Sequence, residues 1–162
     1  MSGIANPRVE RVEAAGQAPA SVGESPVWRA AEQALYWVDI PAQKIVRLRL
    51  ETAERTEWQL PEKVACIAFD HRGTVLAGCE TGLFAVTLTE DAPRGEAMKV
   101  TGKKLAAPLF AFDDMRFNDG RCDRQGRFWS GTWCRTWRRQ ILRARSIAST
   151  SGACCRRRLS TR

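Results

Sequence analysis

Short apolar or alternating runs separated by turns make up most of the first 132 residues, with no apolar stripe at helical spacing. Residues 35–40 (LYWVDI) and 44–50 (KIVRLRL) are two such runs, joined by a turn that contains Pro41. Further runs follow at residues 66–70, 74–78, 83–88 and 121–131. Their content of Val, Ile, Thr, Phe and Trp is typical of strands. The pattern predicts an all-β fold.

One local pattern recurs along the chain. Asp70-x-x-Gly73 precedes a TVLAG run, and Asp123-x-x-Gly126 precedes an RFWSG run. An Asp side chain can cap a tight turn, and Gly accepts the positive φ that closes a short hairpin. A weaker copy surrounds Trp28, and counting from Trp28, Asp70 and Asp123 the spacings are 42 and 53 residues. This spacing suits blades of about four strands, so the chain is predicted to hold two to three blades of a β-propeller.

A propeller of two or three blades leaves apolar sheet faces and strand edges uncovered. Each blade buries its faces against two neighbours, and stability comes from completing the ring. We therefore expect the chain either to be part of a longer protein, or to self-associate or aggregate through its open blade edges.

The positive charge of the chain is confined to its C-terminal end. The whole sequence has 26 Lys and Arg against 18 Asp and Glu, a formal charge of +8. Residues 1–131 hold 17 basic and 18 acidic side chains, net −1, whereas residues 132–162 hold nine Arg and no acid, net +9. The strand-rich part therefore offers no basic surface, and no nucleic-acid partner is expected.

Membrane, secretion and metal-thiolate signals are missing from the sequence. It has no run of 18 apolar residues, and the N-terminus lacks the basic start and apolar core of a secretory signal. The six cysteines form no C-x-x-C pair and His71 is the single histidine, so the usual zinc frameworks are excluded. We expect a cytoplasmic protein with reduced thiols and no membrane partner.

Three groups of motif residues follow one another: GESPVW (23–28) with LYWVDI, then AFD-x-x-G-x-x-LAG (68–78), then RFNDG (116–120) with D-x-x-G-RFWSGT (123–132). Over residues 9–132 the sequence thereby resembles the SMP-30/gluconolactonase/luciferin-regenerating enzyme (regucalcin-like) family. The resemblance implies a six-bladed β-propeller about twice as long as this chain, of which residues 1–132 are the N-terminal part. It also implies one divalent metal ion in the central channel and hydrolysis of sugar lactones such as gluconolactone.

The resemblance makes Glu24 of GESPVW a metal ligand. A carboxylate at the start of a blade's first strand would point into the channel, where Ca²⁺ needs several oxygen ligands, with Zn²⁺ or Mn²⁺ as alternatives. From residue type alone, Glu24 is instead a solvated loop glutamate. The family's other metal ligands and its general base come from later blades, so no catalytic residue is identifiable in this chain.

Arg116 and Asn118 of RFNDG are implied to contact the substrate. A guanidinium and a carboxamide can hydrogen-bond the hydroxyl and carbonyl oxygens of a sugar lactone. The residues alone allow another interpretation, because Asn118-Asp119-Gly120 is a strong turn signal. Asp119 is assigned to that turn rather than to catalysis.

Residues 133–162 differ in composition from the rest and have two interpretations. A basic amphipathic helix would carry on its apolar face Trp133, Trp137, Ile141, Ala144 and Ala148. Such a helix could lie on an anionic membrane or on nucleic acid. The alternative is a slip of the reading frame after Thr132, because codons permitted for the tail, read one nucleotide earlier, encode a GTM…GALYRFD continuation of the family pattern. An Arg- and Cys-rich peptide without acids is typical of a GC-rich gene read out of frame, so we predict the slip.

Two functions of different classes follow from these observations. The first is that of a truncated, metal-dependent sugar-lactone hydrolase, with the chain itself inactive. The second is a non-enzymatic interaction module of propeller type, which binds partners through its open blade edges and basic tail.

Overall fold

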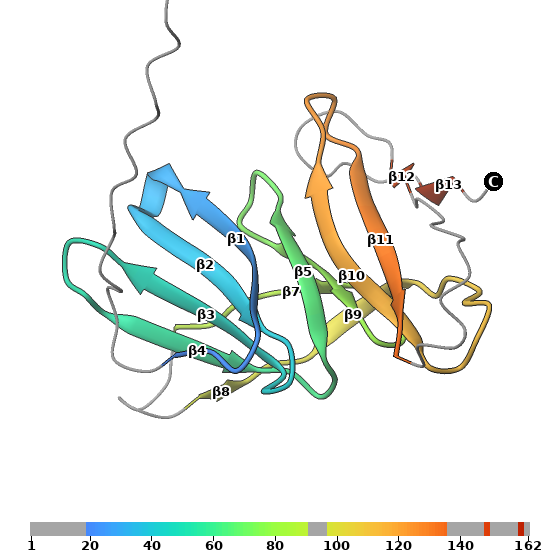
Figure 1. The fold of residues 1–162 in the computed structure, drawn as a ribbon. Coiled ribbons are helices and arrows are strands. Elements are labelled where there is room, and N and C mark those ends of the chain that lie inside the picture. The colour runs from blue at the N-terminus through green and yellow to red at the C-terminus, as the bar shows by residue number, and fades with distance from the viewer. Residues whose placement is uncertain (1–18, 91–96, 136–147, 150–158, 161–162) are drawn as a thin grey trace, which may run out of the picture.

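Three β-sheets lie side by side in the computed structural model, which describes residues 19–90, 97–135, 148–149 and 159–160 (Figure 1). Within these residues the regular elements are strands, apart from one short 3-10 helix, η1 (Ala30–Glu32). The prediction of an all-β fold is confirmed. No helix among the described residues is long and apolar enough to cross a membrane.

The sheets follow one another along the chain. The first contains, in order, β1 (Gly23–Arg29), β2 (Ala34–Asp39), β3 (Lys44–Arg49), β4 (Arg55–Gln59) and β8 (Met98–Lys99). The second contains β5 (Val64–Phe69), β6 (Val75–Cys79), β7 (Leu83–Val86) and β9 (Gly102–Ala106). The third contains β10 (Met115–Cys122), β11 (Phe128–Cys134), β12 (Ala148–Ser149) and β13 (Leu159–Ser160). The predicted runs at residues 35–40, 44–50, 66–70, 74–78 and 83–88 correspond to β2, β3, β5, β6 and β7, whereas the run 121–131 covers the end of β10, a turn and the start of β11. Neighbouring strands pair antiparallel except β4 with β8.

The two copies of the Asp-x-x-Gly pattern form the same turn. Asp70 accepts the amide of Thr74 at 2.8 Å through Oδ1, and Asp123 accepts the amide of Arg127 at 2.9 Å in the same way. The glycine of each copy has a positive φ, 85° and 76° respectively. A side chain that satisfies the turn's amides and a residue that tolerates left-handed backbone close the β5–β6 and β10–β11 hairpins as the sequence predicts.

The second sheet lies between the other two and supplies the centre of the core. All residues of β5 (Val64–Phe69) are buried, and this strand contacts both β1 and β10. On one side, Tyr36 of β2 meets Phe69 edge to face, with 4.7 Å between ring centroids. On the other side, Phe117 of β10 is only 1% exposed. Apolar packing on both faces of β5 therefore holds the first strands of the three sheets together.

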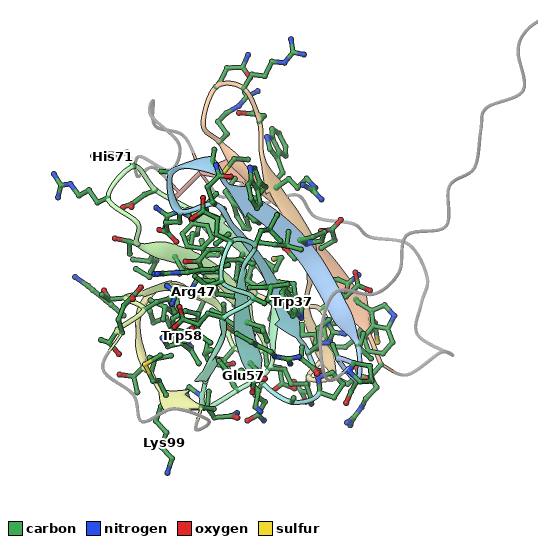
Figure 2. All side chains as sticks on the ribbon, turned by 90° about the vertical axis from the view of Figure 1, so that its left-hand side faces the viewer. Trp37, Arg47, Glu57, Trp58, His71 and Lys99 are labelled. Atoms are coloured by element: carbon green, nitrogen blue, oxygen red, sulfur yellow. The ribbon has the colours of Figure 1, made fainter. Side chains whose placement is uncertain are left out.

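A buried arginine fixes residues 89–90 against the first sheet. Arg47 lies beside Trp58 (Figure 2), with 5.3 Å from Cζ to the ring centroid, and donates to the carboxylate of Glu90 at 2.5 Å. The indole N–H of Trp58 donates to the carbonyl oxygen of Thr89 at 2.7 Å. These contacts pair polar groups whose burial would otherwise be costly.

The tail departs from the helix that its spacing allowed. Trp133 and Cys134 complete β11, where they pair with Arg116 and Met115 of β10, and Ala148 lies in β12. The helical interpretation is therefore wrong at these positions, because their backbone groups belong to the sheet ladder. The remaining residues of the proposed helix, Trp137, Ile141 and Ala144, lie outside the described residues.

Candidate functional site

The first strand of each sheet carries a bulge. The strands β1, β5 and β10 lie next to one another (Figure 1), with β5 in the middle. Their register shifts fall between Glu24 and Val27, between Val64 and Cys66, and between Phe117 and Gly120. A bulge bends its strand and re-aims the side chains around it. Two predicted site residues, Glu24 and Asn118, stand at such bulges.

Two serines make hydrogen bonds at the bulges of β1 and β10. Ser25 has a φ of 53° and is 5% exposed, and its hydroxyl accepts the amide of Ile67 at 3.0 Å. The Ser130 hydroxyl lies 3.0 Å from the carbonyl oxygen of Asn118 and 3.1 Å from that of Asp119, and donates to this carbonyl pair. Neither serine was predicted to have a role, although Ser25 lies in the motif GESPVW and Ser130 in the motif RFWSGT.

The predicted turn at Asn118–Gly120 is wrong. These residues lie inside β10, a continuous strand from Met115 to Cys122, and form its bulge. The Asp119 carboxylate accepts the amide of Gly120 at 2.8 Å, so this side chain satisfies the bulge that took the place of the turn. Short polar residues before a glycine favour bulges as well as hairpin turns. The sequence Asn118-Asp119-Gly120 is therefore compatible with either structure.

Arg116 makes two hydrogen bonds and one cation–π contact. Its Nη1 donates to the carbonyl oxygen of Phe117 at 2.7 Å and to Oδ1 of Asn118 at 3.1 Å. Its guanidinium lies over the ring of Trp133, with 4.8 Å from Cζ to the centroid. The two residues predicted to contact the substrate are thus in direct contact with each other, and Arg116 orients the carboxamide of Asn118.

Two carboxylates act on Arg116 electrostatically. Burial lowers the pKa of Arg116, and the negative charges of Glu80 and Glu24 oppose that shift. Glu80 is itself bound by Lys63, whose Nζ lies 2.8 Å from Oε1, and although burial raises the pKa of Glu80 the bonds and charge of Lys63 lower it overall. Glu24 is therefore close enough to affect Arg116. No motif in the sequence indicated that Glu80 and Lys63 belong to the same site.

A pocket of about 430 Å³ opens beside Arg116. All three sheets and their loops contribute to its lining, which includes Ile40 from the first, Glu80 from the second and Trp133 from the third. Of the three predicted site residues, Arg116 is part of this lining, whereas Glu24 and Asn118 are not. The arrangement joins a cation, hydrogen-bond donors and an aromatic ring around one small-molecule-sized space.

The described residues do not form a metal site by themselves. Among them, no group of three or more His, Cys, Asp or Glu side chains gathers closely enough to hold an ion. The Glu24 carboxylate acts electrostatically on Arg116, which is a cation. A hard divalent ion needs several oxygen ligands, so Glu24 could supply one of a set and not the set. Its role as a metal ligand stays a prediction.

The family was decided by a match over most of the chain. Residues 22–144 match the region described as SMP-30/Gluconolactonase/LRE-like. The chain belongs to this family. The expectation drawn from the motifs GESPVW, AFD-x-x-G and RFNDG is confirmed. The predicted division into residues 1–132 and 133–162 stays a prediction.

Two bacterial members of the SMP-30/gluconolactonase family are named as lactonases. The 6-deoxy-6-sulfogluconolactonase of Pseudomonas putida is 35% identical over 114 residues, covering 70% of this chain and 36% of that protein. The L-arabinolactonase of Azospirillum brasilense is 32% identical over 127 residues, covering 74% of this chain and 39% of that protein. The chain thus spans less than half the length of these relatives.

Solved structures of SMP-30/gluconolactonase-type proteins agree on the fold. A calcium-binding protein, regucalcin, from Agrobacterium tumefaciens superimposes with a TM-score of 0.63 at 24% identity, over 75% of this chain and 38% of that one. A luciferin-regenerating enzyme gives a TM-score of 0.62 at 22% identity, over 71% and 37% of the two chains. The three sheets described above therefore correspond to part of a regucalcin-type β-propeller, as predicted.

Proposed function

We propose that the chain is the N-terminal part of a metal-dependent sugar-lactone hydrolase and is inactive by itself. The observation that carries the proposal is the contact between Arg116 and Asn118, with 3.1 Å from Nη1 to Oδ1, on the bulge of β10 beside a pocket. Family members named as lactonases support the class of reaction. The share of their length that this chain spans, between 36 and 39%, supports its incompleteness.

Arg116 and Asn118 would bind the lactone by donating hydrogen bonds. Because Oδ1 of Asn118 accepts from Arg116, the amide nitrogen of Asn118 is turned away from that arginine. It can then donate to a carbonyl or hydroxyl oxygen of the substrate. The planar guanidinium of Arg116 supplies further donors in a fixed direction. Such contacts orient the lactone ring and exclude water from one side of it.

For the metal, we propose Ca²⁺, with Zn²⁺ or Mn²⁺ as alternatives, and Glu24 as the ligand that this chain supplies. Glu24 lies at the bulge of β1, close enough to Arg116 for its negative charge to affect the pKa of that arginine. This position, near the predicted substrate residue Arg116, supports the proposal. The remaining ligands and the general base would come from outside the described residues.

The experiment compares this chain with a longer protein in which the reading frame continues past Thr132. Gluconolactone hydrolysis is expected from the longer protein and not from this chain. In the longer protein, Glu24→Gln should abolish both hydrolysis and calorimetric Ca²⁺ binding, while Glu51→Gln, in an exposed turn of the first sheet, should leave both unchanged. Hydrolysis by the present chain that is lost in Glu24→Gln would contradict its proposed inactivity.

The predicted frame slip after Thr132 needs a separate test. Sequencing the DNA across codons 130 to 134 decides it, because an inserted or deleted base must lie there. An intact frame with no downstream GALYRFD coding sequence would exclude the slip.

The second candidate is the interaction module, which one observation favours. Trp129 and Trp133 are 39% and 37% exposed on the same face of β11, where a further blade would pack. A defined soluble oligomer in a sedimentation experiment would support this candidate, whereas aggregation would support an incomplete hydrolase. We also propose a cytoplasmic location without nucleic-acid or membrane partners, for which cell fractionation and a salt-dependent DNA-binding assay are the tests.

A further inference from the structure

A second pocket, of about 260 Å³, lies between the later residues of β1, β5 and β10. These three strands run in the same direction (Figure 1), so their first residues lie at one end of the strands and their last residues at the other. On β10, Met115 and Arg116 line the pocket described above, whereas Gly120, Arg121 and Cys122 line the second pocket. The two linings share no residue, so the second pocket is separate from the proposed lactone site.

The floor of this second pocket is apolar. Ile67, Ala68 and Phe69 of β5 contribute to it, and each is at most 8% exposed. Trp28 of β1 also lines the pocket, and its side chain is 45% exposed. We call this space the Trp28 pocket. A large apolar side chain that stays exposed beside an apolar floor is typical of a binding surface, so an apolar group of a ligand can pack here.

The charged residues that line the Trp28 pocket are two arginines. Within the described part of the chain, no carboxylate belongs to this lining. Arg29 lies over the ring of Phe69, with 4.4 Å from Cζ to the centroid, and its Nη1 lies 2.9 Å from Oε1 of Glu32. The charge of Arg29 is therefore balanced by a neighbour. Arg121 is exposed, and no described residue forms an ion pair with it. The lining thus has one positive charge that is free to pair with a ligand.

This combination favours a monoanion with an apolar body. A hydroxyl-rich ring would lose hydrogen bonds to water on the apolar floor, and the Ser25 hydroxyl in the lining already accepts the amide of Ile67. A phosphate dianion would bring two charges to one uncompensated cation. A carboxylate matches a single guanidinium, because the two groups can form two parallel hydrogen bonds. The volume lies just below that of pockets for drug-sized ligands, so the ligand should be small.

We propose that the Trp28 pocket binds a small monocarboxylate with a flat apolar body, such as an aromatic acid. Arg121 binds the carboxylate, while Trp28 and the floor from β5 pack against the ring. The proposal does not depend on the proposed function, because none of these residues lines the pocket beside Arg116. It does not depend on the predicted frame slip either, because every residue of this lining precedes Thr132.

The test compares an acid with a neutral molecule of nearly the same shape. Fluorine-19 NMR titrations of the purified chain measure its affinity for 4-fluorobenzoate and for 4-fluorobenzyl alcohol. The acid should bind at least about fivefold more tightly, because only the acid can pair with Arg121. Trifluoroacetate, which has no ring, should bind at least about tenfold more weakly than 4-fluorobenzoate. An acid that does not bind, or that binds no more tightly than the alcohol or trifluoroacetate, would overturn the proposal.

Substitution of Arg121 tests the contact with the carboxylate. Arg121→Gln, at an exposed position, should lower the affinity for 4-fluorobenzoate about fivefold and leave that for 4-fluorobenzyl alcohol unchanged. Arg121→Lys keeps the charge and should lose no more than about twofold. The matched control is Arg124→Gln, an exposed arginine of the turn after β10 that is not part of this lining, and it should change neither affinity. Equal losses for the acid and the alcohol in Arg121→Gln would contradict a bond to the carboxylate.

Substitution of Trp28 tests the packing against the ring. Trp28→Ala should weaken the acid and the alcohol alike by about fivefold to tenfold, because both have the ring. Trp28→Phe, which keeps a flat side chain, should lose no more than about threefold. Leu109→Ala is the control, since it removes an apolar side chain that is 92% exposed and lies outside this lining. Unchanged affinities in Trp28→Ala, or equal losses in Leu109→Ala, would overturn the proposal.

Discussion

The guanidinium of Arg116 lies over the indole ring of Trp133, with 4.8 Å between Cζ and the ring centroid. The two residues are directly opposite each other in the β10–β11 ladder. Near the start of β11, the guanidinium of Arg127 lies over the ring of Trp129, with 5.3 Å from Cζ to the centroid. The Arg116–Trp133 pair lines the pocket of about 430 Å³, whereas the Arg127–Trp129 pair does not. The second pair can therefore serve as a control for substitutions in the first.

Replacing Arg116 with Met should separate binding from stability. The variant loses a cation–π contact of about 0.5–1 kcal/mol and two hydrogen bonds, but it also avoids burying a charge, whose cost is visible in the lowered pKa of Arg116. We expect the free energy of unfolding of this chain to stay within about 1 kcal/mol of wild type, while the KM of the longer protein for gluconolactone rises at least about fivefold. Urea unfolding and steady-state kinetics measure the two effects.

Arg124→Met is the control for this experiment, because Arg124 is an exposed arginine of the turn after the same strand and does not line the pocket beside Arg116. Arg124→Met should change neither the free energy of unfolding of this chain nor the KM of the longer protein. A loss of stability greater than about 2 kcal/mol in Arg116→Met would assign Arg116 a structural role instead.

Gly78 is expected to tolerate no side chain, because a Cβ there would lie 2.6 Å from Sγ of Cys66 and 3.3 Å from Cβ of Phe117. Gly78→Ala should therefore lower the free energy of unfolding by about 1–3 kcal/mol through overpacking between the second and third sheets. Adding Cys66→Ala removes the sulfur and should recover most of that loss. Gly131→Ala, whose Cβ would meet no atom within 4 Å, should be neutral or slightly stabilising. Equal effects of the two glycine substitutions in urea unfolding would contradict this packing.

The local part of the fold could be predicted from the sequence. The turns at Asp70 and Asp123 depend on residues within four positions of each other, so their chemistry is visible in a short window. The same window could not distinguish a turn from a bulge at Asn118, because that depends on the register between β10 and β11. A strand that continues past a turn signal is revealed only by its partner.

The site was predictable only in part, for a similar reason. Arg116 and Asn118 lie in one motif, and the sequence identified both. Glu80 and Lys63 come from the second sheet and reach the same pocket through packing, which no local pattern encodes. Trp133 was assigned to an unrelated tail because of the arginines that follow it, whereas its pairing with Arg116 places it in β11.

Alkaline pH should destabilise the chain through buried groups that are neutral in the folded state. Burial raises the pKa of Cys66 to about 11 and also raises that of Cys79, while burial and then Glu32 raise that of Tyr36 to about 12. The unfolded chain releases these protons at lower pH, so the stability is complete below about pH 9 and falls as pH rises toward the folded pKa values. Each thiol contributes about 1.4 kcal/mol per pH unit in that window.

Urea unfolding at pH 7.5, 9 and 10.5 measures this dependence. Cys79→Ala should reduce the pH dependence of the free energy of unfolding by the contribution of one thiol, whatever the substitution does to stability at neutral pH. A free energy of unfolding that does not change between pH 9 and 10.5 would show that the thiols are accessible to solvent.

The two Asp-x-x-Gly turns should respond differently to replacement of Asp by Asn. In both, Oδ1 accepts backbone amides, which the Oδ1 of Asn can also do. Oδ2 of Asp123 additionally accepts from Nε of Arg127 at 2.6 Å and Nε1 of Trp129 at 2.8 Å, where Asn would present another donor. Asp70→Asn should therefore leave the melting temperature nearly unchanged and Asp123→Asn should lower it, whereas Asp70→Ala should cost about 1–2 kcal/mol.

The same contacts make a prediction for the titration of Asp123. Burial opposes ionisation slightly, but the bonds from Trp129 and Arg127 outweigh it and lower the pKa of Asp123 to about 2. Its stabilising contribution is present above the unfolded carboxyl pKa and is lost as pH falls through the folded value. Carbon-13 NMR of the Asp123 carboxyl should show a midpoint near 2 in the wild-type chain and a higher one in Arg127→Met. A midpoint at the ordinary carboxyl value in the wild-type chain would mean that Oδ2 does not hold these two donors in solution.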